Sequence, residues 1–214
     1  MADSPRIEVD VRDFARVSAI DTCSVWNLLS SARLFVAAQA RQRWFLVAGY
    51  VRYEALTRRR TRSTDGELAL QEEFRNRLDH ERGFAAAPIT VADLQAVANL
   101  PEVRKLGQGE IAAMALARKM RVGFLSDDQG ARRAASKIGA EPVQTIPHLL
   151  GWLLYEGELT DGDVPVVIAE HEAKVMANRG RLTNFLKAIY HEACRCRLLR
   201  GMPPSPSAAE AAIK

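Results

Sequence analysis

Short apolar runs alternate with amphipathic segments along the chain up to about residue 160. Five runs have the length and composition of buried strands, and they cover residues 17–21, 44–49, 84–90, 122–126 and 141–145. Between them, apolar side chains recur at helical spacing, as at Val25, Leu28, Leu29, Ala32 and Val36. Strands that alternate with helices predict an α/β fold, a doubly wound α/β/α sandwich around a central parallel sheet.

Local sequence also predicts where helices begin and which side chains they bury. Ser24 stands before an apolar-periodic stretch and is expected to cap a helix that continues to about residue 40. Ser126 followed by Gln129 fits a capping box for a helix over residues 128–138. A charged helix is expected from Asp65 to Arg82, with an apolar face formed by Leu68, Phe74 and Leu78.

The pattern changes to helix only from about residue 161. Residues 166–200 read as one long helix or two shorter ones, and they carry an excess of basic side chains. The last residues are rich in Pro, Ser and Ala, which is typical of a disordered tail. The sequence therefore predicts a sandwich over residues 1–160, a helical extension over 161–202 and a disordered tail over 203–214.

Composition is that of an ordinary soluble protein with a sizeable core. The chain has 214 residues, of which 48% are hydrophobic and 26% charged. Trp26, Trp44 and Trp152 lie within apolar runs and are expected in the core. The odd number of cysteines and the N-terminus without an apolar signal favour the reducing cytoplasm. We expect no membrane span, because the sequence has no run of about 18 apolar residues.

Charge is distributed unevenly, although the net charge is only +4. Residues 1–64 and 174–214 are basic, whereas residues 65–173 are acidic. Basic surface attracts phosphate backbones, and an acidic cluster repels them unless cations neutralise it. This combination fits a nucleic-acid enzyme that uses a metal, and an unevenly charged solvated surface is the alternative.

Acidic residues stand beside the predicted strands at positions that share one edge of the sheet. Asp21 ends the first strand, and Asp127 with Asp128 ends the fourth. Glu54 lies about one turn into the helix after the second strand, and Glu110 near the start of the helix before the fourth. Because ligands of such sheets bind at the carboxyl ends of the strands, these acids are expected to converge there. Each alone also has a structural reading, since the helix dipole favours an acid at a helix start.

Convergent carboxylates repel one another and need a compensating charge. Mg²⁺ and Mn²⁺ prefer oxygen ligands of this kind. One or two such ions can activate a water molecule and stabilise the departing oxygen of a phosphodiester. The sequence offers no convincing Ser/His/Asp or Cys/His set that would favour a protein nucleophile instead.

Four segments carry a resemblance to a known family. They read VSAIDTCSVWNLL, VAGYVRYEAL, LGQGEIAAMALARKM and VGFLSDDQGARRAASKIGAEPVQT. In order and spacing they resemble the elements of PIN-domain nucleases: a strand ending in Asp, a helix with one acid, a Gly-Glu helix start and a strand ending in Thr/Ser-x-Asp. The resemblance covers about residues 16–157 and is to bacterial PIN proteins of toxin–antitoxin pairs, including VapC-type toxins and their longer relatives.

The resemblance implies a PIN-like fold, a metal-dependent endoribonuclease and Mg²⁺ or Mn²⁺ as cofactor. It also implies RNA as substrate, an antitoxin as protein partner if the chain is a type II toxin, and a homodimer. Asp127 rivals Asp128 as fourth acid and as metal ligand, and Thr22 and Ser126 would support the acids. The implied catalytic acids are Asp21, Glu54, Glu110 and Asp128, and the implied metal ligands are Asp21, Glu110, Asp128 and Asp127.

Basic side chains near these acids are candidates for phosphate contacts. Arg58 and Arg59 follow Glu54, and Arg132 with Arg133 follows the fourth acid on one helix. A basic helix end is equally well explained by the helix dipole. Two other functions stay open at this point: a non-catalytic PIN module that binds nucleic acid or protein, and a DNA-cleaving PIN nuclease of phage or defence origin.

Overall fold

The computed structural model describes residues 10–58, 64–174 and 181–201. Within them, five parallel strands form one sheet in the order β3-β2-β1-β4-β5. Their bounds are β1 Val17–Ile20, β2 Trp44–Ala48, β3 Phe84–Ala87, β4 Gly123–Leu125 and β5 Val143–Gln144. The prediction of an α/β/α sandwich with a central parallel sheet is confirmed, and each strand falls inside an apolar run.

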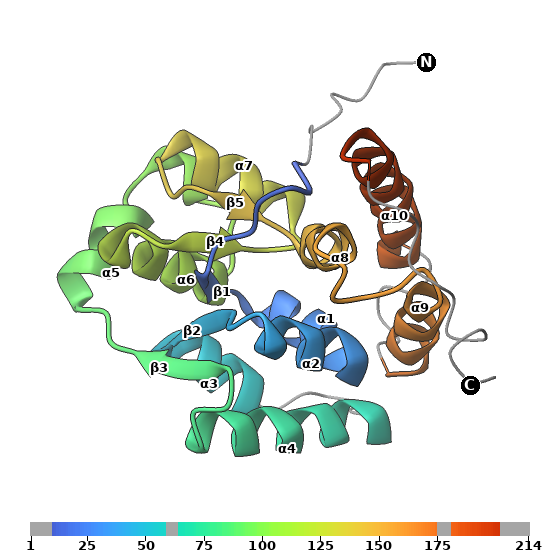
Figure 1. The fold of residues 1–214 in the computed structure, drawn as a ribbon. Coiled ribbons are helices and arrows are strands. Elements are labelled where there is room, and N and C mark those ends of the chain that lie inside the picture. The colour runs from blue at the N-terminus through green and yellow to red at the C-terminus, as the bar shows by residue number, and fades with distance from the viewer. Residues whose placement is uncertain (1–9, 59–63, 175–180, 202–214) are drawn as a thin grey trace.

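Helices cover both faces of this sheet, which explains why the strands are continuously apolar. Figure 1 shows α5 and α6 on one side of the sheet and α1, α2 and α8 on the other. Helix α6 packs against the central strands through small buried side chains such as Ala112, Ala113 and Ala115. The helices of this sandwich are α1 Thr22–Ser30, α2 Ala32–Ala40, α3 Gly49–Leu56, α4 Asp65–Asp79, α5 Val91–Ala98, the 3₁₀ turn η1 Pro101–Val103, α6 Gln108–Met120, α7 Gln129–Lys137 and α8 Ile146–Tyr155.

The single helix expected from Ser24 to residue 40 is wrong in two respects. Asp21 caps α1, because its side chain accepts from the Ser24 backbone N–H. Ser31 then interrupts the helix, and its hydroxyl accepts from Leu34 N to cap α2. The break turns the second helix, so Val36 is 61% exposed although the spacing placed it in the core.

Three further local expectations differ from the structure. Helix α4 buries Leu70 with Phe74 and Leu78, and Leu68 is exposed instead. Trp44 is partly exposed because it is the first residue of β2 and lies at the rim of the sheet. Asp128, not Ser126, caps α7, which leaves the Ser126 hydroxyl free for another contact.

The C-terminal helices α9 (Asp163–Lys174) and α10 (Arg181–Leu199) pack against the sandwich. Helix α10 lies along α8 (Figure 1), where Gly151 permits the approach, since a Cβ there would lie 2.7 Å from Ile189 Cγ1. Helix α9 reaches the α1–α2 junction, with His171 Nδ1 2.9 Å from the Ser30 hydroxyl. The predicted tail over 203–214 lies outside the described residues, and the boundary near residue 160 stays a prediction.

Among the described residues, no helix is both long and apolar enough to cross a membrane. The three cysteines, Cys23, Cys194 and Cys196, are free thiols.

Candidate active site at the carboxyl edge of the sheet

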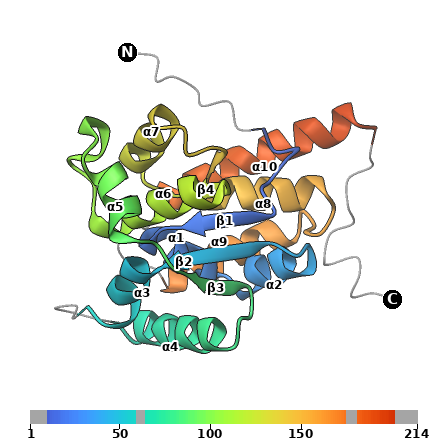
Figure 2. The same cartoon turned by 90° about the vertical axis from the view of Figure 1, so that its left-hand side faces the viewer.

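The strand order reverses between β1 and β4, which are neighbours in the sheet but far apart in the sequence. Such a switch point leaves a crevice at the carboxyl ends of the two strands. Asp21 follows β1 there, and its backbone N–H donates to Leu125 O of β4 at 3.2 Å. Figure 2 shows α3 and α7 beside this edge of the sheet. The edge predicted for the acids is therefore the edge at which the structure places Asp21 and the residues after β4.

Asp21 is fully buried at this edge. One of its carboxylate oxygens accepts from Ser24 N at 2.8 Å, and the other accepts from the Ser126 hydroxyl. Burial raises the pKa of Asp21 to about 7, and the charge of Asp127 adds to that effect, although the hydrogen bonds oppose it. Holding this carboxylate ionised at neutral pH therefore costs free energy unless a cation lies nearby.

Thr22, Glu54 and Gly109 form a close contact between α1, α3 and α6. The Thr22 hydroxyl donates to Glu54 Oε2 at 2.8 Å. A Cβ on Gly109 would lie 2.2 Å from that same oxygen and 2.9 Å from Thr22 Oγ1. Only glycine leaves room for the Glu54 carboxylate against the first turn of α6.

We expect Gly109→Ala to displace Glu54 and to lower any cleavage that depends on it about 100-fold, since a shift of about 1 Å in a catalytic group can cost that much. Stability should change by less than about 1 kcal/mol, because the obstructed group is the end of a flexible side chain. Gly49→Ala is the matched control, since a Cβ there meets nothing within 4 Å. Equal turnover of the two alanine variants would show that the position of Glu54 does not matter.

Glu110 lies in the first turn of α6, where its Oε2 accepts from Gly107 N at 2.8 Å. Burial raises the pKa of Glu110, and the charges of Asp128 and Glu54 raise it further. These three carboxylates therefore lie within electrostatic reach of one another. Their mutual repulsion is the situation that a divalent cation would relieve.

Cys23 lies among the same acids, on the first turn of α1. Burial raises the pKa of its thiol to about 12, and the largest charge contribution comes from Asp21. Asp127, Asp128 and Glu110 raise it further. Since the thiolate is the reactive form of cysteine, this environment argues against Cys23 as a nucleophile.

Asp127 and Asp128 make different contacts. Asp127 accepts from Asn27 Nδ2 at 2.7 Å and from Ile146 N at 2.9 Å, so both of its oxygens are engaged by the protein. Asp128 is exposed and uses one oxygen to cap α7, accepting from Ala131 N at 2.8 Å. Both oxygens of Asp21 are engaged in the same way as those of Asp127, so Asp128 differs from these two acids in being exposed and in having an oxygen without a hydrogen bond to the described residues.

Two buried polar residues of α1, Ser24 and Asn27, take part in this network without having been predicted. The Ser24 hydroxyl accepts from Asp127 N at 3.0 Å, while Asn27 donates to the Asp127 carboxylate. Asn27 Oδ1 is buried and has no partner among the described residues. Their signal in the sequence is the presence of polar side chains within the apolar run that follows Asp21.

The predicted phosphate-binding arginines differ in whether protein atoms already engage their guanidinium groups. Arg132 is partly buried, and its Nη1 donates to Asp127 O at 2.7 Å, which fixes the turn between β4 and α7. Arg58 lies 3.4 Å from Glu54 Oε1, so it pairs with one of the candidate acids. Arg133 is exposed and makes no ion pair with the described residues, whereas Arg59 lies outside them.

Arg104 and Lys105 are cationic candidates that sequence reasoning missed. Both are exposed on the turn that leads into α6, and neither forms an ion pair within the described part of the chain. They directly precede the segment that carries Gly107 and Glu110. The available signal was the Arg-Lys pair immediately before Leu-Gly-Gln-Gly-Glu.

The donor set of this edge is of the kind that binds divalent metals. The side chains offer hard carboxylate oxygens, and an oxygen that accepts one hydrogen bond keeps a second lone pair for a cation. Burial is the main reason that the pKa of Glu110 is raised, and a cation would offset the further contribution from the charges of Asp128 and Glu54. Within residues 10–58, 64–174 and 181–201, however, no three His, Cys, Asp or Glu side chains are gathered closely enough to hold an ion. The chemistry of the donors therefore fits, and the side chains of Glu54, Glu110 and Asp128 would have to move closer to Asp21 to share an ion.

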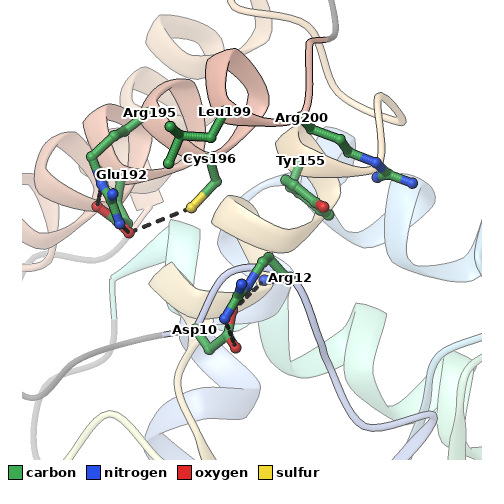
Figure 3. A pocket seen from close by; sticks show the side chains of 8 residues that line it. All are labelled: Asp10, Arg12, Tyr155, Glu192, Arg195, Cys196, Leu199 and Arg200. Atoms are coloured by element: carbon green, nitrogen blue, oxygen red, sulfur yellow. Dashed lines mark hydrogen bonds and ion pairs between the residues drawn. The ribbon is translucent and has the colours of Figure 1, made fainter.

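A separate pocket of about 530 Å³ lies between the N-terminal segment, α8 and α10 (Figure 3). None of the candidate acids lines it. Its charged side chains pair with one another, since Arg12 binds Asp10 at 2.8 Å and Arg195 binds Glu192 at 2.6 Å. This pairing leaves the pocket without a dominant charge and separates it from the acidic edge.

Comparison of this chain with protein-family models, with curated proteins and with solved structures gives no match.

Proposed function

We propose that the protein is a divalent-metal-dependent endoribonuclease of the PIN type. The observation that supports this most is the placement of acids from separate elements around the switch point of a parallel sheet. Asp21 follows β1, Glu54 comes from α3, Glu110 from α6 and Asp128 from the start of α7. Asp21 is fully buried beside Asp127, with its pKa raised to about 7 mainly by burial, and such perturbed carboxylates cluster at functional sites.

In this proposal Asp21, Glu110 and Asp128 hold Mg²⁺ or Mn²⁺, and Glu54 completes the acidic site. A divalent ion supplies water activation and charge neutralisation at a scissile phosphodiester. Ser126 orients Asp21 through its hydroxyl, and Thr22 orients Glu54. Asp127 is assigned to the structural network with Asn27 rather than to the metal.

The charge around this edge suits an RNA substrate. Arg104, Lys105 and Arg133 are exposed cations without ion pairs among the described residues, and they are suited to phosphate contacts. An antitoxin partner, a homodimer and a cytoplasmic location are the associations implied by toxin-type relatives. They are proposed on that resemblance alone.

The direct test is cleavage of mixed single-stranded RNA and of single-stranded DNA of the same length, each with EDTA, Mg²⁺ or Mn²⁺. The proposal expects RNA cleavage with either metal and none with EDTA. Preferential cutting of DNA would show that the substrate is DNA and would leave the proposed metal site unchanged.

One observation favours the alternative of a non-catalytic binding module. Each candidate acid already has a protein partner, as Glu110 has with Gly107 and Glu54 with Thr22 and Arg58. Binding of RNA without cleavage under any metal, by protein shown to be folded, would support that module.

A further inference from the structure

Helix α3 carries two tyrosines whose side chains are exposed at the surface. Tyr50 is 40% exposed and Tyr53 is 48% exposed. Their ring centroids lie 5.8 Å apart in an edge-to-face arrangement. Because both rings are exposed and pack edge to face, part of their aromatic surface is accessible to a planar ligand. Val51 and Ala55 are the residues that anchor the helix to the core.

These rings lie next to the candidate site. On a helix, residues four apart share one face, so Tyr50 and Glu54 form a single stripe along α3, and Arg58 follows two residues beyond the end of the helix. Tyr53 borders the same stripe from the adjacent turn. Glu54 is the acid that contacts Thr22 and the start of α6. A ligand stacked on the tyrosines would therefore continue directly towards the acidic edge.

The charge around the rings suits a polyanion. Arg52 on α3 and Arg58 just beyond its end are exposed, and their nearest acidic partners are long contacts of 3.8 Å to Asp79 and 3.4 Å to Glu54. The Arg52–Asp79 pair is exposed on both sides and contributes little, so the Arg52 guanidinium can exchange its partner for a phosphate at small cost. The Arg58 guanidinium is itself exposed and makes only one long contact with Glu54, which leaves most of its donors open to a phosphate.

We propose that Tyr50 and Tyr53 form a stacking platform for unpaired bases of single-stranded RNA, with Arg52 and Arg58 holding its backbone. The single strand follows from the chemistry, because bases inside a duplex are already stacked and offer no free face. The inference rests on the proposed function for its substrate, and it defines which part of the substrate enters the site first.

The test is the affinity of the full chain for a short fluorescent oligouridine, measured by anisotropy in EDTA so that no metal-dependent cleavage takes place. The variant Tyr50→Leu/Tyr53→Leu should bind about tenfold or more weakly, since stacking is worth roughly 1–3 kcal/mol per base. The variant Tyr50→Phe/Tyr53→Phe keeps the rings and should bind within about threefold of the wild type. Trp44→Leu is the matched control, because Trp44 is an exposed aromatic at the opposite end of β2 from α3 and should not affect binding.

Wild-type affinity in the double leucine variant would overturn the platform, as would a wild-type protein that does not bind the single strand. Unchanged RNA affinity together with a lost dimer in light scattering would assign the tyrosines to a protein contact and also overturn it. A different result would overturn the nuclease proposal alone. If RNA binding depends on the two tyrosine rings but no metal supports cleavage, the stacking platform is retained and the nuclease activity is rejected.

Discussion

Replacing Asp21 by Asn is expected to lower metal-dependent cleavage by at least about 1,000-fold while making the metal-free protein more stable at pH 8. Asn can keep both hydrogen bonds of this position, accepting from Ser24 N and donating to the Ser126 hydroxyl. It removes only the negative charge, which is the property that a metal requires. Loss of activity would therefore not be a consequence of misfolding.

The stability gain depends on pH in a direction fixed by the pKa of Asp21. That pKa is about 7 in the folded protein, against about 3.9 in an unfolded chain. Between those values the native state keeps a proton that the unfolded state has released, so wild-type stability falls as pH rises from about 4 to 7. At pH 8 the penalty is complete and amounts to at most about 4 kcal/mol. Asn carries no such penalty.

Urea unfolding in EDTA at pH 4.5 and pH 8 measures this difference. Asp21→Asn should exceed the wild type at pH 8 and match it more closely at pH 4.5, and added Mg²⁺ should narrow the gap by stabilising only the wild type. Asp13→Asn, a change at an exposed acid outside the site, is the control and should show neither effect. An Asp21→Asn variant that is less stable than wild type at pH 8 would contradict the burial argument.

The two neighbouring acids after β4 should give opposite results. Asp127→Ala removes the acceptor for Asn27 Nδ2 and Ile146 N, and it is expected to lower the free energy of unfolding by about 2–4 kcal/mol. Asp128→Asn keeps the cap of α7 and should cost less than about 0.5 kcal/mol, because Asn and Asp cap helices equally well. Cleavage, in contrast, should be lost in Asp128→Asn.

Denaturant unfolding and a cleavage assay on both variants distinguish the roles. At a temperature where Asp127→Ala is still folded, it should retain measurable cleavage. A stable Asp127→Ala protein without activity, beside an active Asp128→Asn protein, would reverse the assignment and make Asp127 the fourth acid.

Much of the fold could be predicted because its signals are local. The alternation of apolar strands and amphipathic helices gave the parallel sheet, and the shared edge of Asp21 and Asp128 followed from strand direction alone. Capping was harder to predict, because several polar residues near a helix start compete for the role. Asp21 caps α1 instead of Ser24, and Asp128 caps α7 instead of Ser126. The hydroxyl of Ser24 contacts Asp127 after β4, and the hydroxyl of Ser126 contacts Asp21 after β1, so both serines bond to the residue that follows the neighbouring strand.

The contacts within the site could not be predicted because they join residues distant in sequence. Ser126 reaches Asp21, and Asn27 reaches Asp127, only after β1 and β4 have paired. The room that Gly109 leaves for Glu54 depends on how α3 approaches α6. Periodicity also gave no sign that Ser31 would break a helix, since the apolar spacing continues through it.

Metal binding tests the central claim most directly, because a nuclease that is specific for one RNA would not cleave mixed RNA that lacks its target. We would measure the EPR signal of free Mn²⁺ during titration with wild-type protein and with Asp21→Asn at pH 8. The account predicts that the wild type removes free Mn²⁺, that binding weakens when the pH is lowered below the pKa of Asp21, and that Asp21→Asn binds about tenfold or more weakly. An undiminished Mn²⁺ signal with folded wild-type protein, or equal binding by Asp21→Asn, would contradict it.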